Sequence, residues 1–156
     1  MSETPEQKAA DFAAQFEGFS AAPYLDTVAA PPVWTIGYGS TTVNGDGETP
    51  VTADTAPIDE PTGRQWMANE FLRGAKVLAD AVKVPLTVDE EAALLSFVYN
   101  VGIGAFLSST LLRKLNAGDY AGAEAELPRW DHSGGTEVAG LLRRRLAEQA
   151  LFEGKG

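Results

Sequence analysis

The sequence contains no cysteine and only one histidine, His132, among its 156 residues. Without cysteine the chain has no disulfide bonds, thiol nucleophiles or thiolate metal ligands. No second histidine or tight carboxylate cluster accompanies His132, and the acidic residues within 46–60 lack the spacing of a calcium-binding loop. We therefore expect no metal site, and we interpret His132 as part of a surface loop.

The sequence also lacks long hydrophobic runs. No stretch approaches the roughly 18 uninterrupted apolar residues that a membrane-spanning helix needs. Residues 1–6 are acidic and polar, whereas a secretory signal begins with basic residues followed by apolar ones. We therefore expect a protein that is held in a cytosol and has no stable insertion in a membrane.

Basic residues are scarce in the first part of the chain. The net charge is −10, and residues 1–63 carry ten acidic residues but only one basic residue, Lys8. The phosphate backbone of a nucleic acid repels such a chain. The composition therefore argues against DNA or RNA binding, and it does not by itself indicate a substrate.

The length of the chain suits one compact domain with a hydrophobic core. Signals for the starts and ends of helices are frequent along it. Thr4, Thr62 and Thr87 are each followed three residues later by glutamine or glutamate, which is typical of a helix N-terminus. Glycine or proline follows most of the helical segments and ends them. The predicted helices span about residues 5–17, 63–82, 88–99, 111–117, 119–128 and 137–152.

A different pattern separates the first two predicted helices. Residues 33–39 alternate with a period of two, which predicts a β-strand. Trp34, Ile36 and Tyr38 then share one face of this strand, and Thr35 lies on the other. The glycine turns at residues 44–47 are expected to close a hairpin.

These elements predict a single domain with three parts. A small lobe with a β-hairpin covers about residues 12–61, and a long connecting helix covers about 63–83. A larger helical lobe covers about 85–154. No internal repeat or linker divides the chain.

Two carboxylates are candidates for acid–base chemistry at a glycosidic bond, which needs a proton donor and usually a second carboxylate. Glu17 is expected at a helix end, beside Phe16 and Phe19. The negative end of the helix dipole and the apolar neighbours favour the protonated form that a general acid requires. Asp26 lies in a loop-like stretch, where water and backbone amides favour a carboxylate. The alternative reading of both residues is two solvated surface charges.

The segment from Glu17 to Asp26, followed by Thr35 and the run Thr-Ile-Gly-Tyr-Gly of residues 35–39, resembles the active-site region of the phage-type lysozymes. In this glycoside hydrolase family, which includes many endolysins, a glutamate is followed nine positions later by an aspartate and then by such a threonine. The loop from Asp26 to Thr35 is longer here than in the better-known members. Three further segments, at residues 95–102, 106–120 and 140–148, also resemble the family.

The resemblance implies roles for six residues. Glu17 is the general acid, Asp26 is its catalytic partner, and Thr35 holds the attacking water. Arg144 matches a family arginine that lies against the acid glutamate. Tyr38 and Asn100 are the remaining candidates for substrate-binding or supporting residues.

The implied fold is α+β and lysozyme-like, mainly helical, with a small β-hairpin lobe and a larger helical lobe. The implied enzyme is an endolysin that hydrolyses the β-1,4 bond between N-acetylmuramic acid and N-acetylglucosamine in bacterial peptidoglycan. The resemblance implies no cofactor. We expect a monomer that acts on peptidoglycan glycan strands and stays in the host cytoplasm until its release to the cell wall.

Two alternatives remain open at this stage. The first is a catalytically silent module on the same fold that binds the cell wall or belongs to a virion. The second is a lytic transglycosylase, which leaves anhydro sugars and needs no second carboxylate. Retention of Glu17, Asp26 and Thr35 argues against the silent module, and Asp26 favours hydrolysis.

Overall fold

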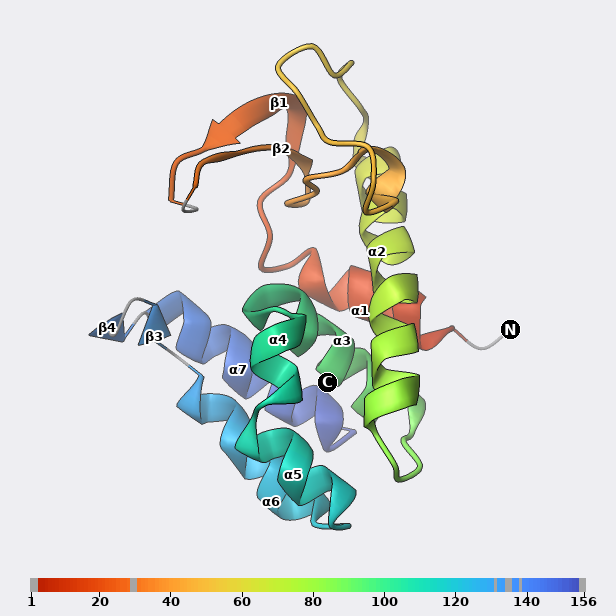
Figure 1. The fold of residues 1–156 in the computed structure, drawn as a ribbon, viewed down its shortest axis with the longest axis vertical. Coiled ribbons are helices and arrows are strands. Elements are labelled where there is room, and N and C mark those ends of the chain that lie inside the picture. Colours follow the sequence, from red (N-terminus) through yellow and green to blue (C-terminus); the bar gives the residue numbers. More distant parts are fainter. Residues whose placement is uncertain (1–2, 29–30, 131, 134–135, 138, 155–156) are drawn as a thin grey trace. The chain divides into compact units, whose positions relative to one another are not determined.

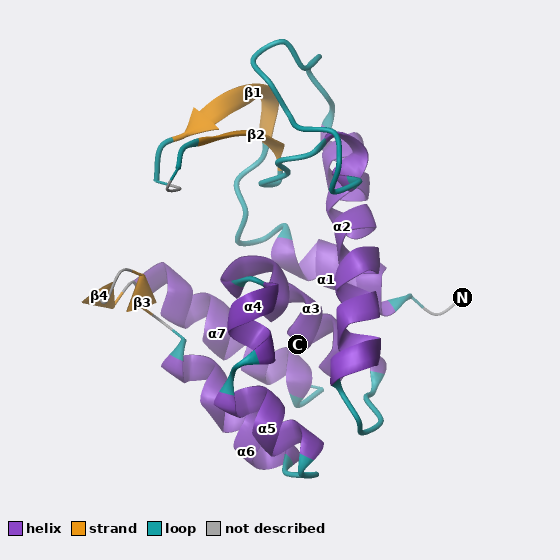
Figure 2. Cartoon of the chain, viewed as in Figure 1, coloured by secondary structure: helices purple, strands orange, loops and turns teal. Residues whose placement is uncertain are grey.

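The structure is a computed structural model that describes residues 3–28, 31–130, 132–133, 136–137 and 139–154. The described chain is mainly helical and carries two short antiparallel sheets, β1–β2 and β3–β4 (Figure 2). Its helices are α1 (Pro5–Ala13), α2 (Glu60–Ala81), α3 (Val88–Val101), α4 (Ile103–Leu107), α5 (Thr110–Asn116), α6 (Tyr120–Glu126) and α7 (Ala139–Phe152). Its strands are β1 (Ser20–Asp26), β2 (Val33–Gly37), β3 (His132–Ser133) and β4 (Thr136–Glu137).

The chain forms two compact units, and the boundary between them falls inside α2. The hairpin unit comprises Ala9–Arg73, and the helical unit comprises Met1–Lys8 together with Gly74–Gly156. Figure 1 shows the elements of each unit along the chain.

The helix α1 begins as predicted but ends earlier. Thr4 and Gln7 exchange hydrogen bonds between side chain and backbone, which confirms the capping box. The helix ends at Ala13 rather than near Glu17, and the next residues form a tighter turn in which the Phe16 amide donates to the Ala13 carbonyl. Gly18 lacks the left-handed backbone conformation expected of a glycine that ends a helix.

The predicted strand is confirmed over Val33–Gly37 as β2, whereas Tyr38 lies in the turn that follows it, and the hairpin partner was assigned wrongly. β2 pairs with β1, which precedes it, so the hairpin loop lies before β2 rather than at the glycine turns after it. The turn at Asn44 and Gly45, both with positive φ, instead folds back a loop whose ends meet at the bridge between Thr42 and Pro50. The glycine pattern therefore predicted a real turn, but this turn does not connect the two strands of the β1–β2 hairpin.

The alternation in β2 creates the core of the hairpin unit. Ile36, Val51 and Trp66 are buried together, and partly buried side chains, including Trp34, pack around them. Trp34 and Ile36 therefore share the face that packs on this apolar cluster, as the period of two predicts, while Thr35 on the other face is buried as well. Because Trp34 and Ile36 pack on this core, Thr35 lies on the opposite face of the β1–β2 sheet.

The helix α2 begins three residues earlier than the threonine pattern predicts. Asp59 immediately precedes Glu60, and its side chain accepts a hydrogen bond from the Thr62 amide. Aspartate before the first helical turn, with Pro61 inside that turn, is a stronger N-terminal signal than Thr62. Thr62 is thus a residue of α2 and not its cap.

The helical unit is built around α3, whose buried residues run from Ala92 to Val98. Its capping box between Thr87 and Glu90 is confirmed. Phe97 lies edge-on to Phe106 and to Trp130, with ring centroids 6.5 and 5.4 Å apart. These aromatic residues form core packing in this unit.

The other predicted helices of this unit are largely confirmed. Ser109 and Asp119 cap α5 and α6. The last helix begins at Ala139 rather than at Glu137, because Glu137 belongs to β4. His132 lies in β3 and not in a loop, and its side chain is outside the described part of the chain.

Two further findings concern the described residues only. Among them, no helix combines the length and the apolar character that crossing a membrane requires. In the same part of the chain, histidine and carboxylate side chains form no group of three that is able to hold a metal ion.

Candidate active site

Asp26 and Thr35 lie on the same face of the β1–β2 sheet. Thr35 is opposite Tyr24 in the register, and Asp26 is opposite Val33. Because opposed residues share a face and alternate residues of one strand do so too, the side chains of Tyr24, Asp26 and Thr35 project to one side. Leu25 and Trp34 form the opposed pair on the other side.

Asp26 is the last residue of β1 rather than a loop residue, so the sequence interpretation of its position was wrong. Its carboxylate Oδ1 accepts a hydrogen bond of 3.0 Å from the Val28 amide, at the start of the hairpin loop. A short contact of this kind between an aspartate and the backbone two residues later orients the side chain. The strand and this turn together set the direction of the carboxylate.

Thr35 is almost completely buried, with 3% of its surface exposed. Its hydroxyl donates a hydrogen bond of 3.1 Å to the carbonyl of Val33 in the same strand. A hydroxyl group has one hydrogen to donate and two lone pairs that accept. With the hydrogen directed at Val33, the lone pairs of Oγ1 suit a donor such as water.

Glu17 lies in the turn that follows α1 and is partly buried. On one side of it in the sequence, Phe16 packs against Phe12 with ring centroids 5.2 Å apart. On the other side, Phe19 packs against Tyr38 at 5.3 Å. Aromatic contacts therefore hold the segment on both sides of this glutamate.

Tyr24 connects the two carboxylates electrostatically. The pKa of its phenol is raised, first by burial and then by the negative charges of Asp26 and Glu17. Both carboxylates are thus close enough to act on one hydroxyl group. Sequence reasoning did not select Tyr24, although its place two residues before Asp26 in a strand puts it on the same face.

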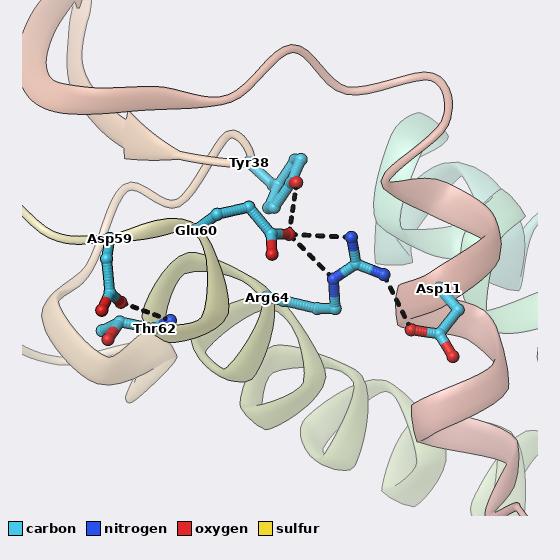
Figure 3. A network of polar contacts seen from close by, with 6 residues as sticks. All are labelled: Asp11, Tyr38, Asp59, Glu60, Thr62 and Arg64. Carbon is cyan, nitrogen blue, oxygen red and sulfur yellow. Dashed lines mark hydrogen bonds and ion pairs between the residues drawn. The ribbon is translucent and has the colours of Figure 1, made fainter.

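Tyr38, predicted as a substrate-binding or supporting residue, is buried, with 6% of its surface exposed. Its hydroxyl donates a 2.5 Å hydrogen bond to the Glu60 carboxylate, which raises the pKa of Tyr38 and lowers that of Glu60. Arg64 also donates to Glu60 and reaches Asp11 on α1 (Figure 3). Sequence reasoning missed this network, because Asp11 and Tyr38 are far in the chain from the Glu60–Arg64 pair.

The other two predicted site residues belong to the helical unit. Asn100 is exposed near the C-terminal end of α3. Arg144 is buried, with 3% exposed, and donates to Ser96 and Glu148. Its pairing with Glu17 stays a prediction.

The chain is mainly helical, and a short β-hairpin follows its first helix in the sequence. Comparison with known proteins identifies the class to which this fold belongs. The family model described as phage lysozyme matches residues 14–148. The chain therefore belongs to the phage lysozyme family, and it is a glycoside hydrolase. The predicted lysozyme-like fold is confirmed.

Individual relatives are endolysins. The chain is 38% identical over 124 residues to the endolysin of Acyrthosiphon pisum secondary endosymbiont phage 1, covering 77% of this chain and 80% of the relative. It is 42% identical over 142 residues to the endolysin of Bacillus phage PZA, covering 88% of this chain and 50% of that longer relative. A solved structure of a P22 lysozyme mutant matches with a TM-score of 0.80 and 27% identity, covering 98% of this chain and 99% of that one. The predicted endolysin class is thereby confirmed.

Proposed function

We propose that this endolysin hydrolyses the β-1,4 bond between N-acetylmuramic acid and N-acetylglucosamine, with Glu17 as general acid, Asp26 as general base and Thr35 as the residue that holds the attacking water. One observation carries the proposal. Asp26 and Thr35 share a face of the hairpin with Tyr24, whose phenol responds to the charges of both Asp26 and Glu17. The shared face and the shared electrostatic neighbour support the assignment of the three residues to one site.

The geometry suits a water molecule between Asp26 and Thr35. Residues that are diagonal neighbours on one face of an antiparallel pair are about 7–8 Å apart, too far for direct contact of two short side chains. A water between them donates one hydrogen to the Asp26 carboxylate and the other to Thr35 Oγ1. Its oxygen lone pair is then directed at the anomeric carbon, while Glu17 protonates the leaving oxygen.

This arrangement favours inversion of the anomeric carbon. A base that acts through water needs a carboxyl separation of about 6.5–9.5 Å, whereas direct attack by the carboxylate needs about 5 Å. A threonine beside Asp26 has a role in the reaction only if a water molecule must be oriented for attack. The proposal accordingly assigns no covalent intermediate to Asp26.

Supporting roles follow for the other residues. The burial of Tyr38 favours a structural role over contact with sugar. Asn100 is exposed and suits contact with the glycan. Arg144 is proposed to pair with Glu17, as the resemblance implies. The enzyme is proposed to act as a monomer on peptidoglycan strands after release from the host cytoplasm, without binding nucleic acid or inserting stably in a membrane.

A lysis assay on permeabilised Gram-negative cells tests the proposal. Glu17→Gln keeps the size of the side chain but removes the acidic proton, so turnover should fall by about 10²–10⁴-fold. The matched control is Glu48→Gln, which changes an exposed glutamate of the same unit and should leave turnover unchanged. Near-normal lysis by Glu17→Gln would remove Glu17 from the mechanism, and an inactive natural protein would support the silent module.

The remaining alternative requires product analysis. Mass spectrometry of fragments released from peptidoglycan should show sugars with free reducing ends. Anhydro sugars would identify a lytic transglycosylase instead.

A further inference from the structure

A polar network in the hairpin unit joins three separate elements. Arg64 on α2 donates through Nε and Nη2 to one Glu60 oxygen, at 2.9 and 2.7 Å, and through Nη1 to Asp11 on α1 at 2.9 Å. Tyr38, just after β2, donates to the same Glu60 oxygen. Figure 3 shows the Arg64 guanidinium between Glu60 and Asp11. One arginine thus connects α1, α2 and the turn that follows β2.

The connected elements are those that carry the proposed site. Asp11 precedes Glu17 by six residues, and only the last turn of α1 and a tight turn separate them. Tyr38 follows Thr35 by three residues. The network therefore holds both the segment that carries the acid and the strand that carries the water-binding hydroxyl.

A second contact reaches the Glu17 segment from its other end. Phe19, two residues after Glu17, packs on the ring of Tyr38. Gly63 on α2 leaves room for it, because a Cβ there would lie 2.8 Å from the Phe19 ring. Tyr38 is thus linked to the glutamate segment through its hydroxyl and Arg64 on one side and through its ring on the other.

The network contributes little to folding. The side chains of Arg64, Glu60 and Asp11 are 39%, 42% and 53% exposed. Ion pairs this exposed are typically worth about 0–1 kcal/mol. The effect of the network on turnover is expected to be larger than its effect on stability, because a displacement of a catalytic group by about 1 Å can reduce turnover by about a hundredfold.

We propose that Arg64 is a positioning residue of this enzyme, which sets the distance from Glu17 to Thr35 and Asp26 through Asp11 on one side and through Glu60 and Tyr38 on the other. The proposal rests on the assignment of Glu17, Asp26 and Thr35 above. Arg64 does not contact substrate in this scheme. A lysine is a poor substitute, because one ammonium group cannot reproduce the guanidinium fork.

The test is steady-state hydrolysis of soluble, uncross-linked glycan strands by Arg64→Met. The matched control is Arg73→Met, which changes an exposed arginine of α2 in the same unit. We expect kcat to fall about 10- to 100-fold with KM changed less than about threefold, because geometry is lost and binding is not. The midpoint of thermal unfolding should match that of Arg73→Met within a few degrees. Equal kcat values for the two variants, or a kcat loss equal to the loss of folded protein, would overturn the proposal.

If Arg64→Met does not fold, milder variants test the same proposal. Asp11→Ala and Tyr38→Phe each remove one arm of the network, and each should lower kcat. Because both arms position the same residues, the double variant should lose less than the product of the single losses. Normal kcat in both single variants would refute the proposal. Glu17→Gln, assayed in parallel, separates the two proposals: if it is inactive while Arg64→Met is normal, only the positioning role fails.

Discussion

Thr35 lies diagonally across the β1–β2 pair from Asp26, on the same face and with Tyr24 directly opposite it. Its hydroxyl hydrogen is directed at the Val33 carbonyl. The lone pairs of Oγ1 therefore accept a hydrogen from water more readily than the group donates one. If Thr35 holds the attacking water as proposed, we expect its hydroxyl, and not its methyl group, to affect turnover.

Substitutions of Thr35 separate these two parts. Thr35→Ser keeps the hydroxyl, and Thr35→Val keeps the shape without it. We expect Thr35→Val and Thr35→Ala to lower kcat by about 10- to 100-fold, because an unoriented water reacts less readily. Thr35→Ser should lose much less. Equal losses in the serine and valine variants, measured on soluble glycan strands, would remove the water-binding role.

The stereochemistry of the product tests the role of Asp26. If Asp26 activates water, the first-formed product has the α configuration, since the attack comes from the face opposite the leaving group. Proton NMR during the first minutes of hydrolysis resolves the two anomers. A β product, or a covalent sugar adduct on Asp26, would show that the enzyme retains configuration while leaving it a lysozyme.

Gly63→Ala should lower activity with little change in stability. The new Cβ would push against the Phe19 ring and disturb its packing on Tyr38. The higher helix propensity of alanine, worth up to about 1 kcal/mol, offsets part of the steric cost. Gly140→Ala on α7 is the control, because its Cβ meets only an ordinary contact. Full activity of Gly63→Ala would show that the position of this ring is not critical.

Glu148→Gln should strongly destabilise the helical unit. The Glu148 side chain is completely buried and accepts hydrogen bonds from Ser96 and from Arg144 and Arg145, which are buried as well. Removing the charge leaves two buried guanidinium groups, at a cost of about 3–5 kcal/mol. Urea unfolding at neutral pH measures this loss. The exposed control, Glu153→Gln, should change stability by less than about 0.5 kcal/mol.

Glu126 should contribute to stability at neutral pH and lose this contribution in acid. Hydrogen bonds from Lys114, and then from Arg129, lower the pKa of the buried Glu126 carboxyl. A pKa that is lower in the folded state stabilises the fold above the unfolded pKa of about 4.3, and the effect disappears as the pH falls through the folded pKa. The stability difference between the natural protein and Glu126→Gln should therefore shrink from pH 6 to about pH 3. A constant difference would contradict the pairing.

Local chemistry determined much of the helical framework. The side chains of Thr4, Thr87 and Asp119 cap helices where the sequence placed them. Capping depends on residues within one turn of each other, so a reader of the sequence has both partners in view. The early start of α2 was missed although its signal is also local. Asp59 and Pro61 form a stronger N-terminal signal than Thr62, from which the start was predicted.

The sequence by itself determined the helical framework and the alternation of β2, and through resemblance it led to the proposal of Glu17, Asp26 and Thr35 as site residues. Tertiary structure decided which strand pairs with β2, and thereby that Tyr24 and Asp26 share a face with Thr35. It also decided that Arg64 joins Asp11 to Glu60 and Tyr38. These relationships depend on contacts between residues distant in the chain, and neither periodicity nor capping specifies such partners, because both describe only the neighbours of a residue along the sequence.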